Sequence, residues 1–175
     1  NAGLIMFSDK INHHLLPSGG NRQYFMLLQA LNDPENYEGK KNFGKAVEFL
    51  MTFVKERAVL IIISDFIGFE KEWQQALTVA LAKFEIMGLM VRDPRDNTLP
   101  VGTGSVVLSD PLSPRQKLIN PDYVKESYES AVRMQKKEVF DAFAMIDADI
   151  LELNTAKSFL HPVLKMLKKR EKRMR

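Results

Sequence analysis

The sequence predicts an α/β fold built on an open, mostly parallel sheet with helices on both faces. Continuous apolar runs alternate along the chain with segments whose apolar residues recur at helical spacing. The strongest run, "AVLIIIS" at residues 58–64, contains no polar alternation. That pattern is typical of a parallel strand covered on both faces, because neither side can then meet water. Right-handed crossovers would bring the carboxyl ends of such strands to one edge.

The first thirty residues predict two strands followed by a helix. "AGLIMFSD" is apolar up to Ser8 and Asp9, and "KINHHLLP" is an expected edge strand that ends at Pro17. The turn residues of "PSGGNRQ" come next, with Asn21 as the expected N-cap of a short helix that ends at Leu31. The chain therefore begins β, β, α.

The middle of the chain continues the alternation. A helix is expected after Asn42, its N-cap, and the strand at 58–64 follows it. The next helix is expected to carry one apolar side formed by Phe69, Trp73, Leu77, Ala80, Leu81 and Phe84. We expect Trp73, the only tryptophan, to be buried on that side. The strand "IMGLMVRDP" is then stopped by Pro94.

The last third predicts a small inserted hairpin at about residues 97–120, then a long helix that opens at Pro121. That helix keeps one apolar face, which only Gln135 interrupts. "ADILELN" is a final short strand, and a basic helix is expected at about residues 162–175. Because no repeat or linker divides the chain, we expect one domain over residues 1–175.

Composition narrows the class of protein. The chain has 175 residues, of which 45% are apolar and 27% charged, and its longest apolar runs are far shorter than the roughly 20 residues that cross a bilayer. It contains no cysteine, which excludes disulfides, thiolate metal sites and cysteine nucleophiles. A cysteine-free chain suits a reducing compartment, and we expect a cytoplasmic location.

Positive charge is concentrated at the C-terminus. Residues 165–175 hold seven basic residues and one acidic residue, a net of +6, so the remaining chain carries 3 − 6 = −3. Such a tail could bind nucleic acid, which gives one alternative function. Basic residues also stabilise an ordinary solvated helix C-terminus.

Three aspartates follow predicted strands. Asp9, Asp65 and Asp93 each come at or just beyond the end of an apolar run. Because ligands of open α/β sheets bind at the carboxyl ends of the strands, these carboxylates are expected along one rim. Aspartate is also common after strands as a turn former or helix cap, and that alternative stays open for each of them.

Two enzymatic interpretations are weaker. "GKKNFGKA", from Gly39 to Ala46, matches G-x-x-x-x-G-K but places Ala46 where a phosphate loop has Ser or Thr, and a polar stretch broken by Pro34 precedes it. A degenerate P-loop nucleotidase therefore remains only an alternative. His13 and His14 would point to opposite faces of a strand, and His161 lies far along the chain, so a histidine metal site is not expected.

Several motifs together resemble a known prokaryotic family. They are "GLIMFSD", "LPSGG", "FGKAVEFL", "VLIIISDF", "VRDPRD" and the closing "LELNTAKSFLHPVLKMLKKR", in this order over nearly the whole chain. The sequence resembles a family of unknown function with a von Willebrand factor A-type domain, whose members are typically encoded beside MoxR-type AAA+ ATPases. The resemblance implies a doubly wound α/β domain that binds proteins and does not turn over a substrate.

The resemblance also implies a magnesium site, from which this chain departs. In related domains the ion is held by a D-x-S-x-S loop after the first strand, by a threonine, and by an aspartate that corresponds to Asp65. This sequence has no D-x-S-x-S, and Lys41 and Asn42 stand where the threonine loop falls. We therefore expect no cofactor in this chain, and magnesium at Asp65 only in a longer form with an upstream D-x-S-x-S loop.

The predicted function is a non-catalytic protein-binding module, most simply an adaptor or partner of a MoxR-type ATPase. Its binding rim is expected to comprise Ser8, Asp9, Lys41, Asn42, Ser64 and Asp65. The chain has no start methionine, and the resemblance implies that the first strand is missing between "GLIMF" and "VLIII". Those strands would pair directly, or another segment or a second chain would fill the vacancy, which gives a route to self-association.

Overall fold

The computed structural model describes residues 1–102, 104–109 and 116–173. The chain forms two compact units. Unit 1 comprises Asn1–Val59 and Ile67–Glu85, and unit 2 comprises Leu60–Phe66 and Ile86–Arg175. The single domain expected from the sequence stays a prediction, because two compact units can belong to one folding domain.

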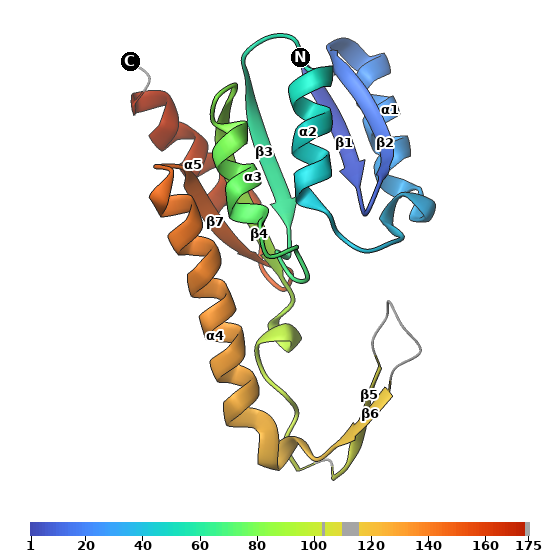
Figure 1. Cartoon of the computed structure of the whole chain (residues 1–175), viewed down its shortest axis with the longest axis vertical. Coiled ribbons are helices and arrows are strands. Elements are labelled where there is room, and N and C mark those ends of the chain that lie inside the picture. The colour runs from blue at the N-terminus through green and yellow to red at the C-terminus, as the bar shows by residue number, and fades with distance from the viewer. Residues whose placement is uncertain (103, 110–115, 174–175) are drawn as a thin grey trace. The chain divides into compact units, whose positions relative to one another are not determined.

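Unit 1 begins with an antiparallel pair, β1 (Ala2–Phe7) and β2 (Ile11–Ser18), followed by α1 (Gly20–Asn32), as Figure 1 shows. The predicted order β, β, α is confirmed. Asn21 as the helix cap is wrong, because the N-cap of α1 is Gly19, two residues earlier, where the backbone is extended. Gly20 has φ +85°, a conformation that glycine adopts without strain.

Three short helices complete unit 1. They are η1 (Pro34–Tyr37), α2 (Phe43–Phe53) and α3 (Trp73–Ala80). The predicted cap Asn42 is confirmed, since its side-chain oxygen accepts a hydrogen bond from Lys45 N at 2.9 Å. The third helix was predicted too long: it ends at Ala80, and Phe84 opens the next strand instead.

Aromatic rings fill the core of unit 1. Phe43 stacks on Phe69 with centroids 5.5 Å apart, and Phe69 meets Trp73 edge to face at 5.8 Å. Trp73 is only 5% exposed, which confirms its predicted burial. Because large rings bury much apolar area each, these contacts stabilise α2 and α3 against the loop that carries Phe69.

Unit 2 is organised around a parallel three-stranded sheet in the order β3 (Ala58–Ser64), β4 (Phe84–Arg92) and β7 (Asp149–Asn154). β4 and β7 pair in register from Met87 opposite Asp149 to Arg92 opposite Asn154. The helices α4 (Pro121–Met145) and α5 (Leu160–Arg173) contact β7. The parallel sheet with flanking helices is thus confirmed for three strands, whereas β1 pairs only with β2 in a separate sheet of the described chain.

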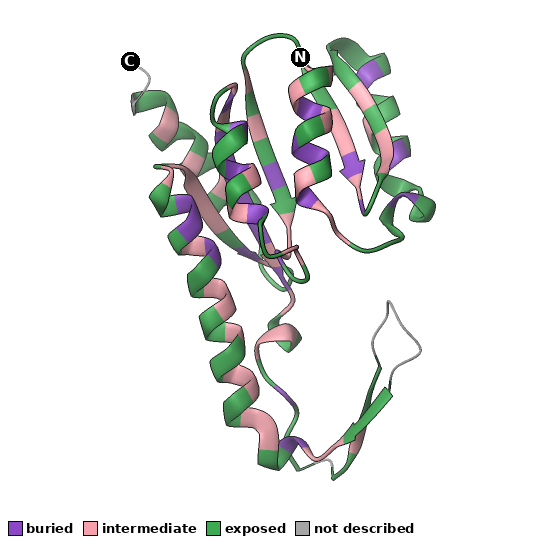
Figure 2. Cartoon of the chain, in the orientation of Figure 1, coloured by how far each residue is buried: buried purple, intermediate pink, exposed green. Residues whose placement is uncertain are grey.

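The strand β3 departs from the expectation that both of its faces would be covered. Val59, Ile61 and Ile63 are 49%, 45% and 66% exposed, while Ile62 is buried (Figure 2). Since alternate residues of a strand share a face, one face of β3 meets solvent. The physical reason is position: β3 lies at the edge of its sheet, with β4 as its one neighbour among the described strands. The vacancy predicted beside it stays a prediction.

β4 is the core strand of unit 2, and Ile86, Met87 and Met90 are almost fully buried on it. α4 packs closely against this strand: a Cβ on Gly88 would lie 2.7 Å from the ring of Phe143. Pro121 opens α4 as predicted, behind the cap Asn120. The basic helix starts slightly earlier than expected, at Leu160.

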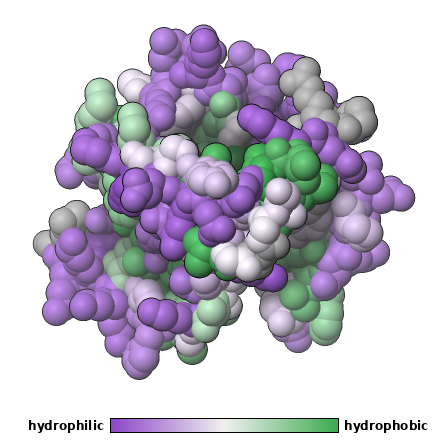
Figure 3. Space-filling view, turned by 90° about the horizontal axis from the view of Figure 1, so that it is seen from below, coloured by the Kyte–Doolittle hydropathy of each residue, from purple (hydrophilic) through white to green (hydrophobic). Residues whose placement is uncertain are grey.

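The predicted hairpin is present as β5 (Val106–Ser109) and β6 (Gln116–Ile119), which pair antiparallel. The "DPLSPR" segment from Asp110 lies outside the described residues. Within the described part of the chain, no helix combines the length and apolar character needed to cross a membrane. Apolar side chains nevertheless reach the surface among hydrophilic ones, as Figure 3 shows for one face.

Candidate binding site

In unit 1, Ser8 and Asp9 form the tight turn after β1. Ser8 is 3% exposed, and its Oγ lies 3.1 Å from Asp9 Oδ1 and 3.0 Å from Asn12 Oδ1. A hydroxyl has one hydrogen to donate, so Ser8 shares it between two acceptors. The Ser8 amide donates to Lys10 O at 2.8 Å, which closes the turn.

A second loop, residues 38–42, lies on this turn. Asn12 Nδ2 donates to Asn36 O and Glu38 O, and the amide of Asn42 donates to Ser8 O at 2.9 Å. Gly39 has φ +106°, and a Cβ there would lie 2.7 Å from Ser8 Oγ. Only glycine suits both constraints. The structure thus brings Ser8, Asp9 and Asn42 together, through two residues that sequence reasoning missed, Asn12 and Gly39.

The lysines near this turn bond to backbone carbonyls. Lys45 Nζ donates to Asp9 O at 3.1 Å, and Lys41 Nζ donates to Ile67 O at 3.1 Å. Gly44 and Lys45, the end of the phosphate-loop pattern, lie in the first turn of α2, and η1 stands in the place of the required strand. This arrangement is unlike a phosphate loop.

Glu70 occupies the N-terminus of α2. Its two carboxylate oxygens accept hydrogen bonds from Phe43 N at 2.9 Å and Gly44 N at 2.6 Å. These amides are the donors with which a helix N-terminus binds an anion. An acidic side chain of the protein already fills that position, so a phosphate would have to displace it.

In unit 2, Ser64 is the last residue of β3 and Asp65 follows it, and a local turn holds both. Ser64 Oγ accepts from Phe66 N at 3.0 Å and lies 3.4 Å from Asp65 Oδ1. Phe66 has φ 54°, the left-handed region that few non-glycine residues adopt. Such a conformation persists only where surrounding contacts fix it.

Those contacts come from α4 and β4. The buried ring of Phe66 packs edge to face on Phe143 at 5.7 Å, and Phe66 O accepts from Gln135 Nε2 at 2.6 Å. Gln135 Oε1 in turn accepts from Arg92 Nη2. Arg92 is 2% exposed, and its Nε has no partner among the described atoms. Gln135, the polar interruption noted in the sequence, is therefore the bridge that fixes the loop of Asp65.

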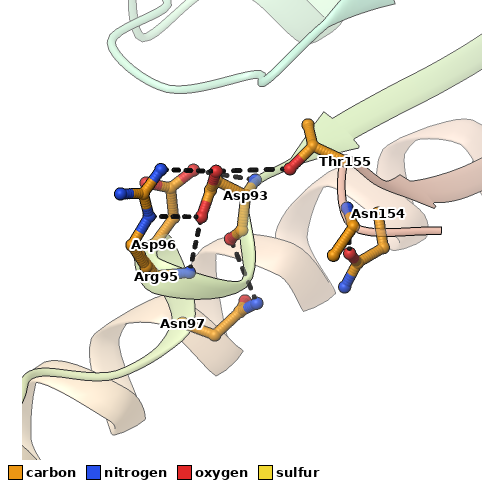
Figure 4. A network of polar contacts seen from close by, with 7 residues as sticks. Asp93, Arg95, Asp96, Asn97, Asn154 and Thr155 are labelled. Atoms are coloured by element: carbon orange, nitrogen blue, oxygen red, sulfur yellow. Dashed lines mark hydrogen bonds and ion pairs between the residues drawn. The ribbon is translucent and has the colours of Figure 1, made fainter.

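Asp93 follows β4 and accepts hydrogen bonds within the next turn, as Figure 4 shows. Its carboxylate accepts from Arg95 N at 2.9 Å, Arg95 Nε at 3.0 Å and Thr155 Oγ1 at 3.2 Å. The hydrogen bond from the Arg95 side chain is the main cause that lowers the pKa of Asp93 to about 2. Asp93 caps η2 (Pro94–Asn97), which favours its alternative interpretation as a helix cap.

The predicted rim is thus distributed over both units. Asp65 and Asp93 follow neighbouring parallel strands, so they lie at the same edge of the three-stranded sheet. Ser8, Asp9, Lys41 and Asn42 belong to unit 1. A rim that joins all six predicted residues remains a prediction.

The donor set does not fit a tight magnesium site. The described residues contain no group of three or more His, Asp or Glu side chains that could hold a metal ion. Ser64 and Asp65 offer one hydroxyl and one carboxylate, whereas Mg²⁺ requires near-octahedral oxygen coordination.

His14 lies edge to face against Phe49 and Phe53, with centroids 5.2 Å and 4.8 Å away, in an aromatic cluster.

One basic residue of the C-terminal helix is tied to the sheet. Arg170 Nη1 donates to Ile86 O at 3.1 Å and lies 3.4 Å from Asp149 Oδ2. Its side chain is only 13% exposed. This contact favours the interpretation of α5 as a packed helix with a solvated basic end.

The solved structures that this chain resembles show the fold alone. A conserved hypothetical protein BatB from Bacteroides thetaiotaomicron matches with a TM-score of 0.54 and 16% identity over 97% of this chain and 78% of that one. An aerotolerance-related membrane protein from Bacteroides fragilis matches with a TM-score of 0.53 and 13% identity over 95% of this chain and 78% of that one.

Sequence relatives are uncharacterized proteins of mycobacteria. One from Mycobacterium tuberculosis is 27% identical over 158 residues, which cover 89% of this chain and 49% of that protein. One from Mycobacterium avium is 28% identical over 157 residues, 89% of this chain and 92% of that protein. The chain spans about half the length of the longer relatives. The model of the family described as "Protein of unknown function DUF58" matches residues 1–138, so the chain belongs to this family.

Proposed function

We propose that this chain is a non-catalytic protein-binding module of the von Willebrand factor A type, an adaptor or partner of a MoxR-type AAA+ ATPase. The observation that carries the proposal is the fixed loop Ser64–Asp65–Phe66. The Phe66 ring, the Phe66 carbonyl and the Ser64 hydroxyl are each engaged, so the backbone beside Asp65 is held in one conformation. A preorganised acidic loop binds a partner with little ordering cost.

The polar contacts favour binding over catalysis. Ser8 and Ser64, the two hydroxyls at the predicted rim, contact Asp9, Asn12 and Asp65 oxygens or a backbone amide. A serine nucleophile is most often activated by a histidine, whereas Ser8 and Ser64 contact groups of their own turns and His14 is packed against Phe49 and Phe53. We therefore propose that neither serine acts as a nucleophile.

The alternatives have less support. A degenerate nucleotidase would need the N-terminus of α2 for phosphate, which Glu70 occupies. A nucleic-acid-associated protein would need exposed basic residues on α5, and Arg170 is committed to Asp149 and Ile86 O. The remaining lysines of α5 keep that second candidate testable.

The test is a binding measurement between the purified chain and a purified MoxR-type ATPase from the same organism. Each loop is tested separately, with Asp65→Asn in unit 2 and Asp9→Asn in unit 1. Asp141→Asn is the matched control, because Asp141 is an exposed aspartate that pairs with Lys137 on α4. We expect at least one loop variant to weaken binding about tenfold or more, since truncating a buried charged contact typically costs a few kcal/mol.

The triple variant Lys168→Gln/Lys169→Gln/Lys172→Gln separates the two candidates, because it removes exposed positive charge from α5 and keeps Arg170, which contacts the sheet. The adaptor proposal expects ATPase binding to persist in this variant, whereas salt-sensitive nucleic-acid binding would be lost. Unchanged ATPase affinity in both loop variants, or no measurable binding by the intact chain, would overturn the proposal.

A further inference from the structure

The helix α1 presents its apolar residues to solvent and its polar residue to the interior. Gln23 and Ala30 are its buried residues. Tyr24, Phe25 and Leu31 are 58%, 66% and 45% exposed. A surface helix ordinarily directs such side chains to the core, so the pattern of α1 is inverted.

The exposed residues are contiguous. Tyr24, Leu28 and Leu31 recur at helical spacing on one side, and the rings of Tyr24 and Phe25 meet edge to face at 5.6 Å. Tyr37 of η1 donates its hydroxyl to Leu31 O at 2.7 Å, and its ring is exposed beside the end of α1. We name these five residues the α1 patch: Tyr24, Phe25, Leu28, Leu31 and Tyr37.

The orientation of α1 is fixed by its buried glutamine. Gln23 Nε2 donates to Ala2 O at 2.7 Å and to Leu16 O at 2.9 Å, which ties the helix to both strands of the β1–β2 pair. Rotation of α1 to bury the aromatic rings would break both hydrogen bonds and leave buried polar groups unsatisfied. Unit 1 therefore keeps the patch outward, as expected for a surface that another molecule covers.

We propose that the α1 patch is the interface of a symmetric dimer, in which α1 of one chain packs on α1 of a second copy. The five side chains expose roughly 500 Å² of mostly apolar surface, so a two-fold contact would bury about 1,000 Å² in total, the low end of specific interfaces, which suits micromolar affinity. Aromatic residues at the centre of the patch are those that dominate the energy of such contacts.

Charge favours a second copy over a lipid surface. In a two-fold contact the same surface faces itself, so any cluster of like charge would repel its symmetry mate. α1 carries one charged residue, Arg22, over its thirteen positions, and the patch itself has none. A lipid-binding helix would instead show a polar face rich in Lys and Arg.

The first test is the mass of the purified chain by sedimentation equilibrium, from about 1 µM to about 200 µM. We expect a dimer with micromolar affinity. The double variant Phe25→Glu/Leu28→Glu should weaken dimerisation about 100-fold or more, because it buries like charges at a two-fold contact. Met145→Glu is the matched control, since Met145 is 86% exposed and lies on α4. Circular dichroism of each variant establishes that the fold is kept.

The second test uses the absence of natural cysteines. Gln29→Cys places one thiol on α1 beside the patch, and Ser130→Cys places one on the exposed side of α4. We expect a short bismaleimide to link Gln29→Cys chains and not Ser130→Cys chains. A monomer at all concentrations, an equal loss in the Met145→Glu control, or cross-linking only through α4 would overturn the proposal. Binding of the monomer to phosphatidylglycerol vesicles, lost in the double variant, would do the same and identify lipid as the occupant.

Discussion

The helices α1 and α4 each direct one glutamine inward, but their outer faces differ in chemistry. Gln23 of α1 bonds two backbone carbonyls, whereas Gln135 of α4 joins the Arg92 guanidinium to the carbonyl of Phe66. The outer face of α4 carries charged pairs such as Lys137 with Asp141, while that of α1 carries aromatic rings. Charged residues therefore dominate the outer face of α4 near its centre, whereas large apolar residues dominate that of α1.

The two glutamines therefore serve different purposes. Gln135 fixes the backbone next to Asp65, so its removal should affect the predicted binding rim as well as stability. Gln23 ties Ala2 of β1 and Leu16 of β2 to α1, so its removal should affect stability and the orientation of the patch. Substitution of each glutamine tests this difference.

The largest expected effect comes from neither glutamine but from the aromatic core of unit 1. Trp73→Ala should lower the free energy of unfolding by about 3 to 5 kcal/mol, because it leaves a large cavity next to Phe69. Chemical unfolding measures it, and Trp73→Phe, which keeps a ring there, should cost less. A loss below about 1 kcal/mol for Trp73→Ala would mean that the aromatic cluster contributes little to unit 1.

The glutamines themselves should rank next, in a defined order. Gln135→Ala should cost about 2 to 3 kcal/mol, because it removes the acceptor of a buried guanidinium, and Gln23→Ala about 1 to 2 kcal/mol, because its partners are neutral carbonyls. Urea unfolding of both variants gives the comparison. In the ATPase-binding assay, only Gln135→Ala should also weaken binding. An equal or larger loss for Gln23→Ala would contradict the distinction between the two helices.

The order of helices and strands was largely predictable from local patterns. Asn42 caps α2 and Pro121 opens α4, because cap and proline preferences depend on residues a few positions apart. Helix lengths were less predictable: the apolar spacing continues through Phe84, yet β4 pairing takes that residue into the sheet. The local sequence pattern does not show which residue will pair with a distant strand.

The candidate site was predictable in residue type and not in connectivity. Ser64 and Asp65 stand out at the end of an apolar run, but the bridge from Gln135 spans 69 positions of sequence to Phe66. The exposed face of β3 and the outward rings of α1 escaped prediction for one reason. Hydrophobic pattern shows which residues can be buried, and only the assembled neighbours decide which are.

Asp93, at the end of β4, should contribute to stability in a pH-dependent way. Arg95 lowers the pKa of Asp93 from 3.8 to about 2, so this carboxylate contributes stability above its ordinary pKa and loses that contribution as the pH falls towards about 2. Asp93→Asn should therefore be less stable than the natural chain at neutral pH, and the gap should narrow as the medium is acidified. Unfolding at a series of pH values measures it, with Asp141→Asn as control. A gap independent of pH would remove the role assigned to the Asp93–Arg95 pair.

The smallest expected effect is that of magnesium. Gln135 and Phe66 hold the loop of Asp65 in place, but position alone does not bind the ion, because Mg²⁺ gives up its water reluctantly and needs several oxygens in octahedral geometry. We therefore expect calorimetric titration of this chain with Mg²⁺ or Mn²⁺ to show no binding tighter than about 1 mM, and the unfolding midpoint to be unchanged by either ion. Asp65→Ala serves as the control. Sub-millimolar binding that Asp65→Ala abolishes would contradict the expectation, and it would mean that the fixed loop of unit 2 is a working metal site whose further oxygens come from residues outside the Ser64–Asp65 turn.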